Sequence, residues 1–377
     1  MQIPSMALLI ASAAYAAIFI AITTISIFIN TKMSRHSLAI TFALFGASYA
    51  SLAFFVQPPE AWDLWHHFRE IDAIRNTGTD YLQGAAKYRE LVVTNYLFYF
   101  VSLLPSNNFL TSIVIFLEFS VFTYVLVDVA KRRPNLGSRT YALTFFYYIA
   151  LTNVVYSISG IRNVLAFVLC GLAVYLDHSA GPTNSTRRIV AVPLYLFPIF
   201  IHPSAAIFGI LRLVAIFRLT GYLAAPLVVL FGVFSDRLPQ LLLNLEHPVL
   251  RQIGGLLSYY SDFTGGLDPR LWGVNLVLVL VLFLYAASQR SAMYRFTGLS
   301  SGYTDYFMAY CLFMFGAAFV SPIIFTRMLY GLGLMAVPII AAVVADRKHS
   351  LPFTIFSCVY LTGVLSYQAV ELIHALT

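Results

Sequence analysis

Hydrophobic residues in this chain form long continuous runs that are separated by short polar segments. Twelve of these runs predict membrane-spanning helices, at residues 5–29, 37–56, 109–130, 140–157, 160–177, 189–202, 203–217, 219–235, 271–288, 304–324, 328–345 and 351–374. A further run, 91–104, is too short to cross a hydrocarbon core of about 30 Å at a rise of ~1.5 Å per residue. We therefore predict that 91–104 is a re-entrant or surface-lying helix.

Composition supports this picture. Hydrophobic residues make up 60% of the 377 residues and charged residues only 10%, whereas soluble domains carry roughly 25% charged residues. This excludes a soluble enzyme, a disordered tail and a coiled coil. The predicted fold is all-α: a polytopic integral membrane protein with about twelve transmembrane helices. We expect one transmembrane domain over 1–377, with a first outer loop at 57–104 and a second at 236–270.

Basic residues mark the ends of the predicted spans. They occur at Lys32, Arg35, Lys131, Arg132, Arg133, Arg139, Arg187, Arg188, Arg212, Arg218, Arg290, Arg295, Arg347 and Lys348. Because Lys and Arg gather in cytoplasmic loops, we predict that these segments are cytoplasmic and that both termini lie outside. Orientation then accounts for most of the net charge of +7, and no nucleic-acid partner is expected.

Two arginines break this rule, because the same topology places them at the outer face. Arg162 and Arg327 lie where spans 160–177 and 328–345 begin. Span 203–217 begins on that side too. Helix N-termini and Arg both bind phosphate, so the three helix starts and two guanidinium groups predict a diphosphate site. The alternative is that each Arg reaches lipid headgroups or pairs with a carboxylate.

The loop between the second and third spans has helical spacing over 60–72. Leu64, Phe68 and Ile71 fall on one face, and a second face carries Asp63, His66 or His67, and Glu70. With Trp62 and Trp65 suited to the membrane interface, this predicts an amphipathic helix that roofs a cavity. A metal site built from Asp63, His66 and Glu70 is one alternative, although no HExxH or CxxC pattern is present. A solvated polar face is the other.

His202 lies between two apolar runs at the predicted outer boundary. Its ordinary pKa suits proton transfer near neutral pH, and two cationic neighbours would keep it neutral. It is therefore a candidate general base, with a hydrogen-bonded structural role as the alternative. Glu118 and Asp128 are expected to serve helix packing or the cytoplasmic end of their span.

Several stretches resemble the EpsG-like, Wzy-type polysaccharide polymerases. They are Asp63–Phe68, Arg75–Tyr81, Tyr96–Tyr99, Ser159–Ala166, Ile201–Ala205 and Thr326–Tyr330. Their order is similar to that of the family over roughly 55–345. The sequence departs from the family pattern at Asn163, where Gln is usual, and at His66 or His67, where Arg is frequent.

The resemblance implies a GT-C-like membrane glycosyltransferase in the bacterial cytoplasmic (inner) membrane, with its active site facing the periplasm. It implies undecaprenyl-diphosphate-linked oligosaccharides as substrates, membrane lipids as surroundings, a chain-length-regulating co-polymerase as partner, and neither metal nor cofactor. Such a polymerase moves a growing glycan from its lipid diphosphate onto the non-reducing end of a lipid-linked repeat unit.

One mechanism unites the residues with the resemblance. Arg162 and Arg327 hold the donor diphosphate, and His202 or Asp63 removes the proton of the acceptor hydroxyl. The absence of an evident nucleophile predicts inversion at the anomeric carbon. Substrate-binding roles are expected for His66, His67, Arg69, Arg75, Asp80, Asn163, Tyr259, Tyr260 and Tyr330.

Three other functions remain open. A transporter or flippase of the same lipid-linked sugars would show internal repeats and charges near mid-membrane, whereas the ionisable residues here gather at one face. An O-antigen-ligase-like glycosyltransferase would use the same donor with another acceptor. A scaffold of an export complex would need none of these residues.

Overall fold

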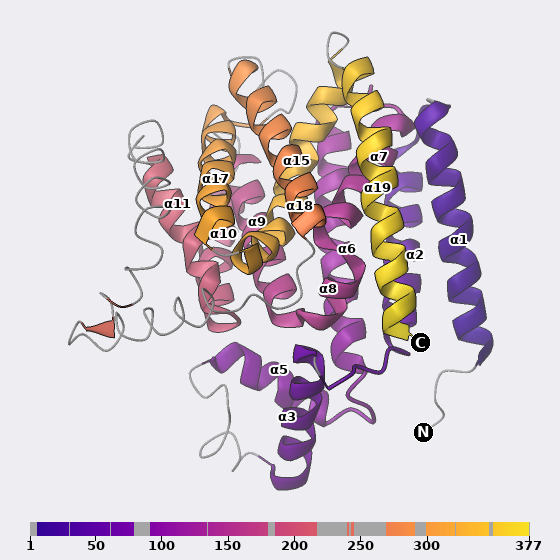
Figure 1. Ribbon diagram of the computed structural model, residues 1–377, viewed down its shortest axis with the longest axis vertical. Coiled ribbons are helices and arrows are strands. Elements are labelled where there is room, and N and C mark those ends of the chain that lie inside the picture. Colours follow the sequence, from indigo (N-terminus) through magenta and orange to yellow (C-terminus); the bar gives the residue numbers. More distant parts are fainter. Residues whose placement is uncertain are drawn as a thin grey trace.

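The computed structural model describes residues 6–29, 31–60, 62–78, 91–133, 135–179, 185–216, 240, 243–244, 269–290, 299–320, 322–346 and 350–376. Figure 1 shows a bundle of roughly parallel helices, with two short helices lying below it. The described residues contain no strand, and an isolated bridge joins Lys32 to Gly137.

The elements follow one another along the chain with short connections. They are α1 (Met6–Phe28), α2 (Arg35–Ala53), α3 (Asp63–Thr77), α5 (Val92–Ser102), α6 (Phe109–Arg132), α7 (Ser138–Thr152), α8 (Val154–Ser159), α9 (Ile161–Ser179), α10 (Ser185–Leu196), the 3₁₀ turns η1 (Phe197–Phe200) and η2 (Pro203–Ala205), α11 (Ala206–Ile216), α15 (Pro269–Ser288), α17 (Ser301–Val320), α18 (Pro322–Ala345) and α19 (Ser350–Leu376).

Seven helices in the described part of the chain are long and apolar enough to cross a membrane: α1, α2, α6, α9, α15, α18 and α19. Their hydropathy and length match a hydrocarbon core of about 30 Å. The predicted all-α, multi-pass fold is therefore confirmed. The count of twelve spans stays a prediction, since span 219–235 lies outside the described residues.

The predicted span 140–157 is wrong as a single helix. It is split at Asn153, whose φ of 50° lies in the left-handed region. A right-handed helix cannot continue through such a residue, and Asn is among the few side chains that tolerate it. The chain therefore ends α7, forms the six-residue α8, and then enters α9.

Two further predictions about helix ends need correction. Span 189–202 is a shorter helix, α10, followed by the 3₁₀ turn η1, and span 203–217 is the turn η2 followed by α11. The predicted start at 328 is also wrong, because α18 begins at Pro322. Proline fits the first turn of a helix, where its missing N–H group has no helical partner.

The core is built around α18. About 94% of its membrane-length segment is buried, against α6, α7, α9, α15, α17 and α19. Close approach depends on Gly331, where an added Cβ would lie 2.5 Å from Cζ of Phe208 and 2.7 Å from Oη of Tyr310. Small residues at such contacts let helices pack tightly where lipid offers no hydrophobic drive.

Two short helices, α3 and α5, cover one end of the bundle, which we call the roofed end (Figure 1). The buried residues of α3 are Leu64, His67, Ile71 and Ile74, a spacing that forms one helical face. That face differs from the predicted one, because His67 takes a core position and Phe68 lies beside it.

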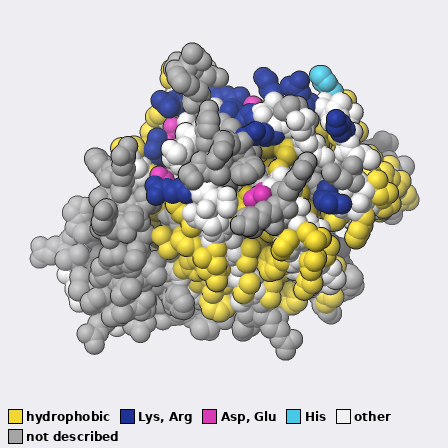
Figure 2. Space-filling view, turned by 90° about the horizontal axis from the view of Figure 1, so that it is seen from above, with side chains coloured by type: hydrophobic (Ala, Val, Ile, Leu, Met, Phe, Trp, Pro, Cys, Tyr) yellow, Lys and Arg dark blue, Asp and Glu magenta, His cyan; other side chains and the backbone are white. Residues whose placement is uncertain are grey.

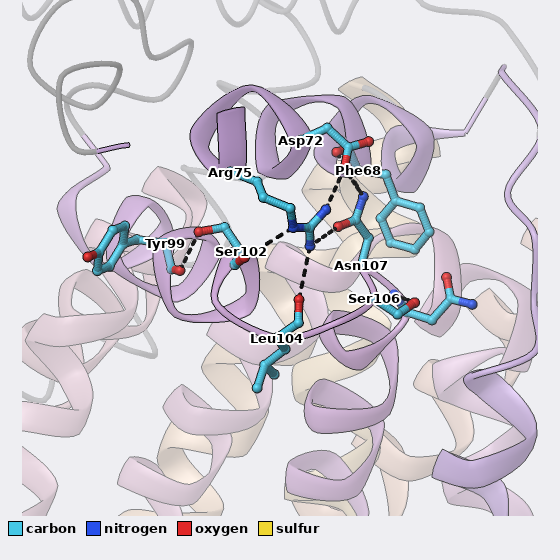
Figure 3. Close-up of polar contacts among 9 residues, drawn as sticks. Phe68, Asp72, Arg75, Tyr99, Ser102, Leu104, Ser106 and Asn107 are labelled. Carbon is cyan, nitrogen blue, oxygen red and sulfur yellow. Dashed lines mark hydrogen bonds and ion pairs between the residues drawn. The ribbon is translucent and has the colours of Figure 1, made fainter. Parts of the chain in front are cut away.

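Arg75 fastens α3 to the segment after α5, as Figure 3 shows. Its guanidinium bonds Asp72 at 2.6 Å, Oδ1 of Asn107 at 2.7 Å and the carbonyl oxygen of Ser102 at 3.1 Å. Asn107 also donates to Asp72 at 2.9 Å. These contacts give Arg75 a bracing role, and its substrate-binding role stays a prediction.

The opposite end, where α6 and α9 finish and α10 begins, is the basic end. Figure 2 views it from above and shows Lys and Arg side chains gathered on this face. Asp128 pairs there with Arg132 at 2.9 Å and Arg187 at 2.8 Å, and Tyr175 donates to the same carboxylate at 2.7 Å. The network joins α6, α9 and α10.

Candidate active site

Arg162 lies at the roofed end, one residue into α9. Its Nε donates to Nε2 of His67 at 3.4 Å, so the roof helix α3 contacts the start of a central span. His67 is 1% exposed and packs its ring 5.2 Å from that of Phe98. Of the two adjacent histidines, His67 is therefore the one that lies in the site.

His202 lies in the turn between η1 and η2, outside the seven candidate spans, and is 6% exposed. The neighbouring carbonyl of Ile201 accepts a hydrogen bond from Oγ1 of Thr94 at 3.0 Å, which ties the turn to α5. The backbone N–H of Ser204 donates to Nδ1 of His202 at 3.3 Å. The side chain thus caps the turn that starts at Pro203.

Arg162, Arg327 and His202 come together although 165 residues separate the two arginines in sequence (327 minus 162). Burial, and then the charges of Arg327 and Arg162, hold the pKa of His202 well below its ordinary value. The imidazole is therefore neutral at neutral pH. Two half-buried guanidinium groups around a neutral ring make a strongly positive pocket.

The hydrogen bond from Ser204 also fixes the tautomer of His202. A backbone N–H can only donate, so Nδ1 is the acceptor and the ring proton is on Nε2. A neutral ring in this form offers a hydrogen-bond donor, and cannot take up a proton at Nε2. The geometry therefore disfavours His202 as the general base and favours it as a donor to an anion.

Three groups surround the N-terminus of α9. A Cβ added at Gly160 would lie 3.6 Å from Oη of Tyr330 and 3.8 Å from Nδ2 of Asn163. Asn163 is 5% exposed, and its Oδ1 has no hydrogen-bond partner among the described residues. A buried carbonyl without a partner suits a ligand that donates a hydrogen bond, such as a sugar hydroxyl.

Asp63 is the first residue of α3 and is exposed, and its charge reaches Tyr330. His66 and Arg69 turn toward the outer face of α3. The ring of Trp65 lies 5.1 Å from that of His66 and 4.9 Å from the guanidinium carbon of Arg69. The structure therefore brings Asp63 toward the site and directs His66 and Arg69 away from Arg162.

A protein-family model describes residues of this same region. The EpsG family model matches residues 74–375, which is most of the chain. The chain belongs to the EpsG family. No curated protein and no solved structure matches it. Membership confirms the resemblance in the sequence, and it indicates in general terms a glycosyltransferase-like polymerase of polysaccharide synthesis in a membrane.

One residue of this EpsG-family site was misjudged from the sequence. Glu118 lies in the middle of α6, is 2% exposed and accepts a hydrogen bond from Tyr148 at 3.1 Å. Its Oε2 has no partner in the described part of the chain, and its charge reaches Tyr330. The signal was present, because a lone carboxylate inside a span is rare and is often functional.

The expectation that three helix N-termini meet at the site is wrong. Arg327 lies in the second turn of α18, which begins at Pro322, so it does not lie beside the first N–H groups of that helix. Pro203 begins a three-residue 3₁₀ turn rather than an α-helix. Only α9, which starts next to Gly160, presents a full helix N-terminus to Arg162.

Asp80, Tyr259 and Tyr260 lie outside the described residues, so their substrate roles stay predictions. A metal site at Asp63, His66 and Glu70 has no support: no group of three or more His, Cys, Asp or Glu side chains that could hold a metal occurs in the described ranges.

Proposed function

We propose that this EpsG-family protein polymerises a polysaccharide by moving a growing glycan from undecaprenyl diphosphate onto the non-reducing end of a lipid-linked repeat unit. The transfer inverts the anomeric carbon and uses no metal. The observation that carries the proposal is the convergence of Arg162 and Arg327 on a buried, neutral His202. This positive pocket suits a diphosphate leaving group.

The donor diphosphate is held by the two guanidinium groups, by Nε2–H of His202 and by the N-terminus of α9. Arg binds phosphate oxygens through paired N–H donors. As the glycosidic bond breaks, negative charge grows on the diphosphate, and donors fixed in advance stabilise it without reorganisation. His67 supports this arrangement because its Nε2 accepts from Arg162 and orients that side chain.

The acceptor hydroxyl is activated by Asp63. Two bases were open from the sequence, and the hydrogen bond from Ser204 to Nδ1 disfavours His202. Asp63 begins the roof helix and reaches Tyr330 electrostatically, while Oδ1 of Asn163 is suited to accept from another acceptor hydroxyl. The acceptor oxygen attacks the anomeric carbon opposite the diphosphate, which gives inversion.

The orientation belongs to the proposal as well. With the basic end in the cytoplasm, the roofed end faces the periplasm of a bacterium. There it meets lipid-linked repeat units in the outer leaflet of the cytoplasmic membrane. A chain-length-regulating co-polymerase remains the expected partner, and an O-antigen-ligase-like enzyme differs only in the acceptor.

A flippase of lipid-linked oligosaccharides is the second candidate, and Glu118 is the observation that favours it. A buried carboxylate within a span is a feature of transport pathways. The other ionisable residues discussed here lie toward the two ends of the bundle, where Asp128 is already matched by two arginines. This arrangement favours the polymerase.

Purified protein in liposomes, given labelled lipid-linked repeat units, tests the proposal. Elongated glycans support a polymerase, and transbilayer movement without elongation supports the flippase. Arg162→Ala and Arg327→Ala should each lower elongation on the order of 10²–10³-fold. The matched control is Arg290→Ala, because Arg290 is exposed and pairs with Asp305 at the basic end. Full elongation by both site variants would refute the proposal.

A further inference from the structure

Two lipid-facing helices, α15 and α19, leave a groove of about 360 Å³ between them. In Figure 1 they run next to each other. The groove is lined by Leu271, Val274 and Val277 from α15, and by Phe356, Val359 and Gly363 from α19. Its volume falls in the range of small-molecule sites, about 300–1,000 Å³.

The groove is open to a chain-like occupant along its length. Val277 and Val359 form its edges and are 51% and 73% exposed, as expected of lipid-facing positions. An added Cβ at Gly363 would meet no atom within 4 Å. An apolar chain could therefore lie over Gly363 without moving the backbone of α19.

The groove adjoins a smaller polar space inside the bundle. Leu271 borders both, and the inner space is also lined by Trp272, Gln368 and Thr326. Within the described residues, neither Nε1 of Trp272 nor Oε1 of Gln368 has a hydrogen-bond partner, and both atoms are buried. The amide of Gln368 is oriented by its donation to the carbonyl of Ala150 at 2.8 Å.

One unpartnered donor and one unpartnered acceptor in the same space are costly unless a ligand satisfies them. The indole N–H of Trp272 suits a phosphate oxygen, and Oε1 of Gln368 suits a hydroxyl. Thr326 directly precedes Arg327 in α18, so this space leads to the positive pocket. The groove, the polar pair and the arginine thus form a continuous series from lipid to site.

We propose that the polyprenyl diphosphate carrier enters the site sideways between α15 and α19, with its isoprenoid chain in the groove and its diphosphate passing Trp272 and Gln368 to Arg327. The identity of the lipid rests on the proposed function. One groove fits one chain rather than the two chains of a phospholipid. A second groove between α2 and α6, of about 420 Å³, shares no lining residue with the space beside Thr326.

Photo-crosslinking tests this without turnover. The probe is a polyprenyl diphosphate with a benzophenone on its isoprenoid chain, mixed with the protein in phosphatidylglycerol–phosphatidylethanolamine vesicles. We expect labelled peptides from α15 and α19. Gly363→Trp fills the groove and should lower labelling about tenfold. The control Leu284→Trp adds the same bulk to a lipid-facing position of α15 that borders neither space, and should label normally.

Labelling that falls mainly on α2 and α6, or that survives Gly363→Trp unchanged, would overturn the proposal. So would equal labelling of the groove by a benzophenone-bearing phosphatidylglycerol. Trp272→Phe keeps the ring and removes the N–H, so it guards against a misfolded Gly363→Trp. Its KM for the lipid-linked donor should rise several-fold with kcat little changed, whereas an unchanged KM counts against the polar passage.

The two proposals fail separately. A labelled groove in a protein that moves lipid-linked sugars without elongating them refutes the polymerase and leaves the entry path standing. Full elongation by a folded Gly363→Trp variant refutes the entry path and leaves the polymerase standing. Elongation and labelling are therefore measured on the same preparations.

Discussion

The two ends of the bundle use arginine in opposite ways. At the basic end, Arg132 and Arg187 surround one carboxylate, Asp128, and Arg212 pairs with Asp177. At the roofed end, Arg162 contacts the imidazole of His67, and Arg162 and Arg327 act together on His202. The first arrangement neutralises charge and joins helices. The second concentrates positive charge around neutral rings, as a site for an anionic group requires.

The difference predicts which end tolerates a changed charge. A carboxylate lost from the basic end leaves buried arginines without their counter-ion, so the cost is one of stability. A group lost from the roofed end leaves the fold intact, because the site is arranged for a ligand, so the cost is one of rate.

The largest effect is expected for the proposed base. Asp63→Asn should lower kcat by about two to four orders of magnitude, because the amide cannot accept the proton of the acceptor hydroxyl. The matched control is Asp72→Asn, a second exposed aspartate of α3, which should stay near the wild-type rate. Elongation in liposomes measures both. Equal rates for the two variants would remove Asp63 from the mechanism.

The basic end should respond in stability instead. Asp128→Ala is expected to lower the free energy of unfolding by about 3–5 kcal/mol, since it leaves Arg132 and Arg187 uncompensated. Denaturant unfolding in detergent measures this. Asp305→Ala is the control, because its partner Arg290 is 60% exposed, and it should cost no more than about 1 kcal/mol. Similar losses for the two variants would contradict a special role for the Asp128 network.

A pair of substitutions at His202 separates a donor from a base. His202→Gln keeps an acceptor for Ser204 and a donor toward the diphosphate, so its kcat should stay within about tenfold of wild type. His202→Leu removes both and should lose about 10–150-fold, the range of a hydrogen bond to a charged group of about 1.5–3 kcal/mol. If Gln and Leu impair elongation equally, His202 acts as a base after all.

The smallest effect concerns pH. Burial and two arginines hold the pKa of folded His202 well below that of the unfolded chain, about 6.5. Below that value the unfolded chain binds a proton that the folded protein does not. Between pH 7.5 and 5.5 the free energy of unfolding should therefore fall by about 1.4 kcal/mol through this residue. His202→Gln should lack that part of the loss, and an identical pH dependence in both proteins would speak against it.

Much of the fold could be read from the sequence, because the spans are long apolar runs and the roof helix has clear helical spacing. The start of α18 at Pro322 was also readable, since proline favours a first helical turn. The break at Asn153 was not. It depends on a left-handed backbone that leaves no mark in an apolar run.

The candidate site divides in the same way. Arg162, Arg327 and His202 stood out as ionisable residues at predicted span ends, and the structure brings them together. The choice between His66 and His67 depended on which face of α3 packs inward. The tautomer of His202 depends on one backbone N–H, that of Ser204. The groove needs two helices distant in sequence, so periodicity could not reveal it.

The enclosure of α18 has a consequence for biosynthesis. This helix carries Arg327 and lies at the centre of the bundle, yet only α19 follows it among the described helices. Domains form progressively from the N-terminus as the ribosome delivers the chain, so the earlier spans must wait around an incomplete interior. A nascent chain that stops before Pro322 has Arg162 but no second guanidinium, and cannot bind its lipid before synthesis is nearly finished.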